Sequence, residues 1–158
     1  MDVTLRWIEN TGNPDMALEA GDVTLGDGLV EAVILSLFTD ARAPADMDVP
    51  GDRRGWWGDG DAQAPRPLGS LLWTLAREKE TDETRLRARD YARQALAWMP
   101  ASDEPAVADV VGVAVDAWWA ARGMLGLSVM LTLRGGSNRA LRFEHALADG
   151  QVRRLGAM

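Results

Sequence analysis

The chain of 158 residues has no cysteine, and it has only one histidine and one lysine. The absence of cysteine excludes disulfides, thiolate catalysis and zinc–thiolate sites. His145 alone cannot form a multi-histidine metal site or an HExxH helix, so we interpret it as a structural residue near the end of a strand. No segment approaches the roughly 18 uninterrupted apolar residues of a membrane span. We therefore expect no membrane partner and no secretory signal peptide.

Acidic residues outnumber basic ones, 24 against 17, for a net charge of −7. This charge opposes a nucleic-acid backbone, so we expect no nucleic-acid partner. Sixteen of the basic residues are arginine, and seven tryptophans accompany two phenylalanines and one tyrosine. Arginine and tryptophan are both enriched at protein–protein interfaces. The composition therefore fits a folded assembly protein, with residues 1–158 forming a single domain.

The N-terminal part of the sequence predicts strands followed by a buried helix. Alternating apolar residues from Val3 to Trp7 indicate a half-buried strand, and residues 16–25 are typical of a hairpin. Asp27 is placed to cap a helix over residues 28–38. Apolar residues nearly encircle that helix, which predicts that it is deeply buried.

Residues 40–67 form a long loop or arm that is rich in proline, glycine, aspartate and tryptophan. Loops of this length are uncommon in compact domains and are usually functional or disordered. Two adjacent arginines and two adjacent tryptophans exceed what a solvated linker needs, so we predict an interaction arm. The alternative is that the tryptophans fold back over the protein's own core. The interface candidates in the arm are Arg53, Arg54, Trp56, Trp57 and Asp59.

Two further helices are predicted after the arm. Ser70 can cap a short helix, and Thr81 can cap a second, longer one. Trp73 and Arg77 are four residues apart, hence on one helix face, where the guanidinium can stack on the indole. We predict that Trp73, Arg77 and Glu78 organise the core and its rim. An interface role for these three residues is the alternative.

The last third of the chain predicts three strands, at about 107–118, 124–134 and 139–146. Their short connections require an antiparallel meander. The fold class is therefore α+β, a small mixed or antiparallel sheet packed against two or three helices. We predict that the edge of the third strand accepts a strand from a partner, with Arg139, Leu141 and Phe143 as candidates. The alternative is cover by the N-terminal strand, and we expect the tail from Asp149 to be irregular.

The sequence has no recognisable catalytic constellation. Neither GxxxxGK[ST] nor a strand-linked GxGxxG occurs, and the calcium loop DxDxDG with its closing glutamate is absent. Asp59 and Asp61, beside the tandem tryptophans, could form a glycosidase-type pair of carboxylates. A peptidoglycan hydrolase or sugar-binding module is thus the alternative function. Our prediction is a protein with no enzymatic activity, no cofactor and no metal.

Five motifs occur in order along the chain: Ser36–Ala43, Arg54–Asp59, Gly69–Trp73, Ala76–Lys79 and Tyr91–Trp98. Together they resemble the baseplate protein family typified by gene product 46 of Mu-like contractile phages, over roughly residues 20–135. The resemblance implies a virion structural protein of the baseplate wedge, similar in role to gene product 25 of T-even phages, and an α+β fold. The T-even-like branch carries Glu-Pro-Arg before its central strand. This chain has Glu104-Pro105-Ala106 there and lacks the arginine.

The same resemblance implies the partners and the location. Such a subunit would bind other baseplate wedge and hub proteins and the tail sheath subunit, and it would help to start sheath assembly. It would occur in multiple copies around the tail axis of a contractile phage or a phage-tail-like particle. Assembly would take place in the host bacterial cytoplasm.

Overall fold

The computed structural model describes residues 27–60 and 66–155, together with the backbone of four short strands in the N-terminal region. These strands are β1 (Leu5–Trp7), β2 (Pro14–Met16), β3 (Leu18–Glu19) and β4 (Asp22–Val23). β1 pairs with β2 and β3 pairs with β4, both antiparallel and both separate from the main sheet. The predicted hairpin is therefore confirmed as β3–β4, and the predicted first strand is described only over β1.

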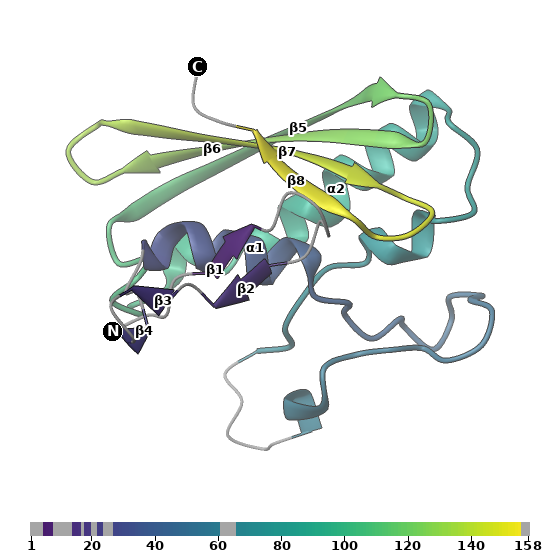
Figure 1. Ribbon diagram of the computed structural model, residues 1–158, viewed down its shortest axis with the longest axis horizontal. Helices are drawn as coiled ribbons and strands as arrows, with labels where there is room; N and C mark the ends of the chain where they lie inside the picture. Colours follow the sequence, from purple (N-terminus) through teal and green to yellow (C-terminus); the bar gives the residue numbers. More distant parts are fainter. Residues whose placement is uncertain are drawn as a thin grey trace.

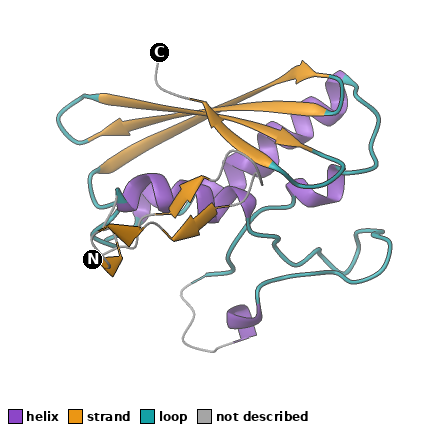
Figure 2. Cartoon of the chain, viewed as in Figure 1, coloured by secondary structure: helices purple, strands orange, loops and turns teal. Residues whose placement is uncertain are grey.

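Four antiparallel strands form the main sheet in chain order, and two α-helices lie below it as seen in Figures 1 and 2. The strands are β5 (Val110–Ala121), β6 (Met124–Leu133), β7 (Asn138–Ala146) and β8 (Val152–Leu155). The helices are α1 (Gly28–Phe38) and α2 (Asp82–Leu96), with three 3₁₀ helices, η1 (Trp57–Gly60), η2 (Leu72–Leu75) and η3 (Met99–Ala101). The α+β class and the C-terminal meander are confirmed.

Both α-helices begin where their capping residues predict. The Thr84 N–H donates to Thr81 Oγ1 over 3.2 Å at the start of α2. Asp27 precedes α1, but its carboxylate forms an ion pair with Arg139 of β7 instead of a side-chain cap. Partial burial raises the pKa of Asp27, yet the hydrogen bond and the positive charge of Arg139 outweigh it and hold that pKa below its ordinary value. Arg139 thus ties the beginning of α1 to the sheet.

The core lies between the inner face of the sheet and the two helices. Alternate residues of β6 face it as predicted, and each is completely buried: Leu125, Leu127, Val129 and Leu131. Leu141 and Phe143 of β7 lie on the same side of the sheet and are also buried. The Phe143 ring meets the ring of Phe38 edge-on, with the two centroids 5.3 Å apart. Leu141 and Phe143 therefore pack inside the protein.

The C-terminal tail differs from the prediction. Instead of an irregular end, Val152–Leu155 form β8, which pairs with β7 over Arg142–His145. Gly150 has a φ of 73°, and its N–H donates to the Ala146 carbonyl, so residues 146–150 form a turn. The prediction of a free edge on the third strand is therefore wrong over Arg142–His145, the part of β7 that β8 covers. The N-terminal strand does not cover it either, because β1 pairs with β2.

A bulge changes which residues of β5 face the core. The pairing with β6 shifts between Val110 and Gly112, and the extra residue, Val111, is 52% exposed. The extra residue of a bulge interrupts the alternation of a strand, so Val111 does not share the face of Val113 and Val115, which lie opposite the buried Leu131 and Val129.

Replacing Phe143 with alanine is expected to lower the free energy of unfolding by about 3–5 kcal/mol, because a completely buried ring is lost and a cavity remains. Chemical denaturation followed by circular dichroism measures the change. Val111→Ala is the control, since an exposed side chain should change the free energy of unfolding by less than about 0.5 kcal/mol. Equal losses in the two variants would contradict the core position of Phe143.

Candidate interaction surface: the arm and its root

The chain leaves the body after α1 and returns to the same place 30 residues later, so the intervening segment projects as an arm (Figure 1). We use the name "arm" for residues 40–60 and 66–69. At its root the Ala41 N–H donates to the Ser70 carbonyl over 3.0 Å, and the Ser70 N–H donates to the Thr39 carbonyl over 2.9 Å. The buried Ser70 hydroxyl donates to the Leu37 carbonyl over 2.5 Å. Helix α1 and both ends of the arm are therefore joined at one serine.

Gly69 makes this close approach possible. Its φ is 104°, a region that favours glycine, and a Cβ on it would lie 2.2 Å from the Thr39 carbonyl oxygen. A side chain of any size would thus collide with backbone that is itself hydrogen-bonded to Ser70. The root of the arm requires glycine at this position.

Arg53 organises the first half of the arm from within. Its guanidinium donates to the carbonyl oxygens of Pro44, Ala45 and Met47, over 3.2 Å to Ala45 and 3.0 Å to Met47. The Ala43 N–H donates to the Arg53 carbonyl over 2.9 Å. A single guanidinium therefore binds three carbonyl groups and stabilises a loop that has few apolar side chains.

Arg54 braces the arm against the body. Its guanidinium forms an ion pair with Asp40 at 2.6 Å and lies over the indole of Trp73, 4.5 Å from the ring centroid. The Trp73 indole N–H in turn donates to the Ala41 carbonyl over 2.8 Å. We call Asp40, Arg54 and Trp73 the strut, because together they connect the arm to η2.

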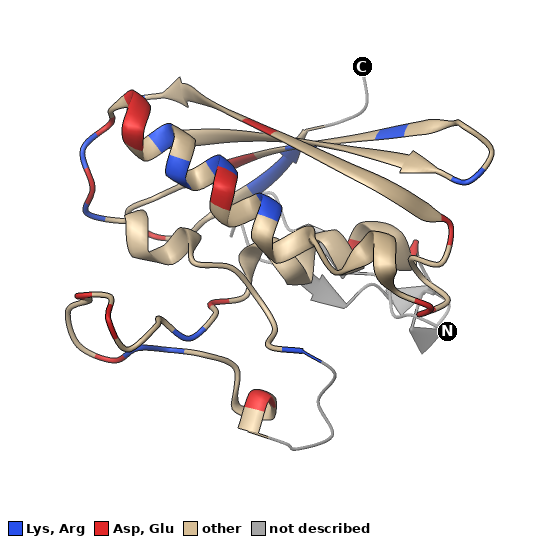
Figure 3. Cartoon of the chain, turned by 180° about the vertical axis from the view of Figure 1, so that it is seen from behind, with Lys and Arg blue, Asp and Glu red and all other residues tan. Residues whose placement is uncertain are grey.

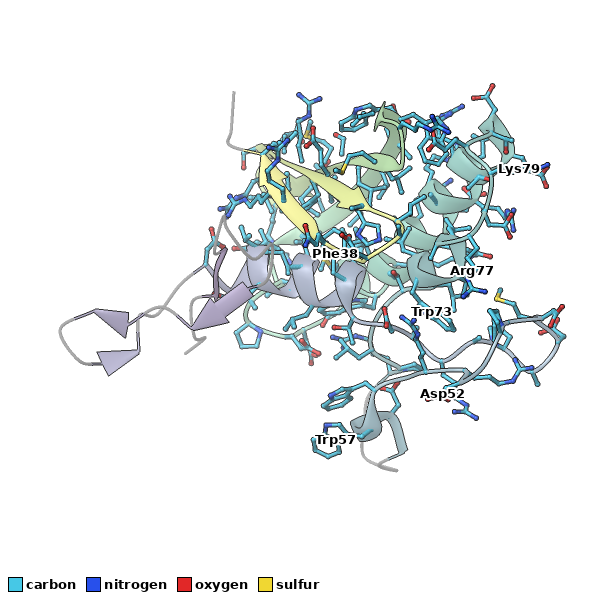
Figure 4. All side chains as sticks on the ribbon, turned by 45° about the vertical axis from the view of Figure 1, so that its right-hand side comes forward. Phe38, Asp52, Trp57, Trp73, Arg77 and Lys79 are labelled. Atoms are coloured by element: carbon cyan, nitrogen blue, oxygen red, sulfur yellow. The ribbon has the colours of Figure 1, made fainter. Side chains whose placement is uncertain are left out.

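The predicted partner of Trp73 was Arg77, and that pairing is wrong. The segment forms the 3₁₀ helix η2, which ends at Leu75, so the α-helical spacing does not place Arg77 over the indole. Arg77 is exposed, beyond the end of η2 (Figure 4). Glu78 forms an ion pair with Arg87 of α2 at 3.3 Å. No local pattern could have indicated Arg54, which is 19 residues from Trp73 in the sequence.

Trp57, the first residue of η1, lies on the arm away from Phe38 (Figure 4), and Trp56 immediately precedes it. Trp57 is 87% exposed and Trp56 39%, with their ring centroids 5.1 Å apart. They do not fold back over the core. Trp56 covers the buried Gly58, where a Cβ would come within 2.0 Å of the indole. Trp57 therefore stands outward on a formed turn.

Asp59 serves the structure of this turn. Its Oδ1 accepts from the Leu68 N–H over 2.9 Å, and its Oδ2 is enclosed without a hydrogen-bond partner among the described residues. Asp61, the other carboxylate of the suggested glycosidase pair, lies outside the described residues. The geometry of Asp59 therefore gives the carbohydrate alternative no support.

The returning half of the arm is fixed by a second arginine on a second tryptophan. The Arg66 guanidinium lies 3.3 Å from the ring centroid of Trp98 and forms an ion pair with Glu104 at 2.7 Å. The Trp98 indole N–H donates to the Ser36 hydroxyl over 3.1 Å. Glu104 belongs to the Glu-Pro-Ala segment that lacks an arginine, and here the arm supplies its cation. No local pattern indicated Arg66, because its partners Trp98 and Glu104 are distant along the chain.

A second surface follows the edge of β5 that faces away from β6. The Ala117 N–H donates to Asp116 Oδ1 over 2.9 Å, and its carbonyl accepts from Arg85 of α2 over 3.2 Å. The Asp116 and Arg85 side chains therefore form hydrogen bonds with both backbone groups that Ala117 directs to this edge. Successive residues of a strand direct their backbone N–H and C=O groups to opposite edges. The groups of Val113 and Val115 therefore face the same edge as those of Ala117.

A groove of about 490 Å³ lies beside this edge. It is lined by Val113 of β5, by Pro100, by Asp90, Arg93 and Gln94 of α2, and by Ala97 just after that helix. Acidic and basic residues are both distributed along α2, as the red and blue segments of that helix in Figure 3 show. The edge and the groove together offer both main-chain and side-chain contacts to an extended segment.

Within residues 27–60 and 66–155, no three histidine, aspartate or glutamate side chains are grouped so that they could hold a metal ion. In that same part of the chain, no helix has the length and apolar character needed to cross a membrane. The described features are those of a small α+β module with a projecting arm and a groove beside one edge of its sheet.

Comparison with known proteins identifies the family of this module. The profile of the family described as "Phage protein GP46" matches residues 29–138, and the chain belongs to that family. It is 39% identical to "Baseplate protein gp46" of Escherichia phage Mu over 148 residues, which cover 92% of this chain and 96% of that protein. It is 40% identical to "Mu-like prophage FluMu protein gp46" of Haemophilus influenzae over 98 residues, 62% of this chain and 65% of that protein. No solved structure matches the chain.

Gly69→Ala is expected to lower the free energy of unfolding by more than about 2 kcal/mol, since the new Cβ meets the Thr39 carbonyl as well as an unfavourable φ. Gly135→Ala is the matched control. Its φ of 98° is similar, but nothing lies within 4 Å of the Cβ position, so it should cost only about 1–2 kcal/mol. Urea denaturation of both variants measures the difference. If Gly69→Ala costs no more than Gly135→Ala, the close approach at the root is not tight.

Proposed function

We propose that this protein is a structural, non-enzymatic component of the baseplate of a contractile phage tail or phage-tail-like particle. Within it, the protein acts as a wedge subunit present in multiple copies around the tail axis, after assembly in the host bacterial cytoplasm. Membership of the GP46 family and the name of the phage Mu relative support the baseplate role. The observation that carries the proposal is Trp57, held 87% exposed on a braced arm.

The arm is the contact with neighbouring wedge or hub proteins. An exposed indole is unfavourable in water, and burying one in a partner's pocket yields a large part of an interface's binding energy. The strut and the contacts of Arg53 hold the arm in a defined shape before binding. A preformed arm loses little conformational entropy when it binds, which favours tight association.

Trp57→Ala is expected to abolish or strongly reduce baseplate assembly while leaving the melting temperature unchanged within about 1 °C, because the side chain contacts little of its own protein. Baseplates are assembled from the purified tail proteins of the same particle and counted by electron microscopy. Met130→Ala is the control, as Met130 is exposed (38%) on the sheet, away from the arm. Normal assembly by Trp57→Ala would remove the arm from the interface.

The edge of β5 is the proposed site for the start of sheath assembly. An incoming strand of the tail sheath subunit, or of a neighbouring wedge subunit, would pair with the open groups of Val113 and Val115 and lie in the groove beside α2. We propose this edge instead of that of β7, because β8 already covers β7 over Arg142–His145. The side-chain contacts at Ala117 would limit pairing to the first half of β5.

Val113→Pro tests this edge without breaking the sheet. Proline removes an N–H that faces outward, so the hydrogen bonds to β6 remain and the variant should fold. We expect it to assemble into baseplates that fail to start sheath polymerisation, scored by electron microscopy. Ala114→Pro removes an N–H that faces β6 and should lower stability by about 3 kcal/mol or more, which checks the orientation of the strand. A folded Val113→Pro variant that starts sheath normally would exclude strand addition here.

A further inference from the structure

A cleft of about 310 Å³ lies at the root of the arm, between the end of α1, η2 and the turn that joins β7 to β8. Its charged or titratable lining residues are Asp40, Arg54, His145 and Asp149. Two of these, Asp40 and Arg54, belong to the strut, and the Trp73 ring lines the same cleft. The cleft thus places the only histidine of the chain beside the residues that hold the arm.

His145 is buried in a way that favours the neutral imidazole. Only 7% of its surface is exposed, its ring centroid is 5.5 Å from that of Phe38, and Nδ1 is enclosed without a hydrogen-bond partner among the described residues. Burial lowers the pKa of His145 below its ordinary value of 6.5, while the charges of Asp40 and Asp149 act in the opposite direction. The folded protein therefore holds this histidine neutral at neutral pH.

The charged neighbours of His145 differ in what else they bind. Asp149 accepts a hydrogen bond from the Gln151 N–H within its own turn, whereas Asp40 is the ion-pair partner of Arg54. Arg154 lies opposite Phe143 on β8 and is exposed, so it does not share the cleft. Asp40 is thus the one carboxylate of this cleft that both His145 and the arm can use.

We infer that His145 is a proton-sensitive release for the arm: a protonated imidazole attracts Asp40 away from Arg54 and loosens the strut. The Arg54 and Asp40 side chains are 51% and 44% exposed, and such exposed ion pairs contribute little to stability. A charge created inside the cleft has a much greater need of a counter-ion, because water reaches it poorly. The competition for Asp40 therefore favours the histidine once it is charged.

The direction of the pH dependence follows from this environment. The unfolded chain binds the proton more readily than the folded one, since folding lowers the pKa of His145. The stability associated with the neutral imidazole is fully present at high pH and is lost as the pH falls below about 6.5. The arm should accordingly be braced at neutral pH and loosened in acid, whatever partner it binds.

An NMR titration of the intact protein tests the inference, because the single imidazole gives isolated C–H signals. The indole N–H of Trp73, identified by its loss in Trp73→Phe, reports on the strut through its bond to Ala41. We expect both signals to move with one midpoint below pH 6.5. Arg54→Gln frees Asp40 and should shift the histidine midpoint to higher pH, while Asp40→Asn should shift it to lower pH. In His145→Gln, the Trp73 signal should no longer titrate.

Glu144→Gln is the matched control, since Glu144 adjoins His145 in sequence but pairs with Arg153 on the other side of the sheet. It should change neither midpoint, and circular dichroism confirms that each variant is folded. A Trp73 signal that stays constant while His145 titrates would overturn the inference. So would an Arg54→Gln variant that is folded and has an unchanged histidine midpoint. None of these measurements requires a partner, so their failure would leave the proposed baseplate role untouched.

Discussion

The pairing of residues 39–41 with Ser70 is the constraint on which the rest of the molecule depends. It joins the end of α1, both ends of the arm and the start of η2 through three short hydrogen bonds. Without this closure, the two ends of the arm would not be held together, and Trp73 would not be placed to meet Ala41. The Ser70 hydroxyl and the side-chain-free Gly69 are what allow the two backbones to come so close.

Cations take the place of an apolar core in the arm. Arg53 binds carbonyl oxygens, and Arg54 and Arg66 each combine an ion pair with the face of a tryptophan. A planar guanidinium suits this task better than an ammonium group, because it can stack on an indole and donate in its own plane at the same time. The abundance of arginine, which we first associated with interfaces, therefore serves the internal structure of the arm as well.

The two proposed contact surfaces are built differently. The arm presents one large side chain on a preformed support, whereas the β5 edge presents main-chain groups beside a charged helix. Side-chain contacts at Ala117 close one end of that edge, as proteins commonly do to prevent unwanted pairing. The His145 cleft connects only with the first surface, so the two contacts can be altered separately.

The sequence by itself determined the regular elements of this protein. The apolar spacing of α1, the Thr81 cap of α2 and the strict alternation of β6 each depend on neighbours within a few residues, and all three are present in the structure. The order of the motifs also indicated the family, and the unusual composition of residues 40–67 marked the arm. The local sequence did not indicate the bulge at Val111 or the strand β8. Both depend on pairing with another strand.

Only the tertiary structure decided which residues act together in the candidate site. Arg54 rather than Arg77 lies over Trp73, Arg66 reaches Glu104, and Asp40 stands between Arg54 and His145. Each partnership joins residues that are well separated in the sequence, so no helical or strand period encodes it. It arises because the closure at Ser70 brings the arm, η2 and the sheet to one place, where charge and ring geometry then select the partners.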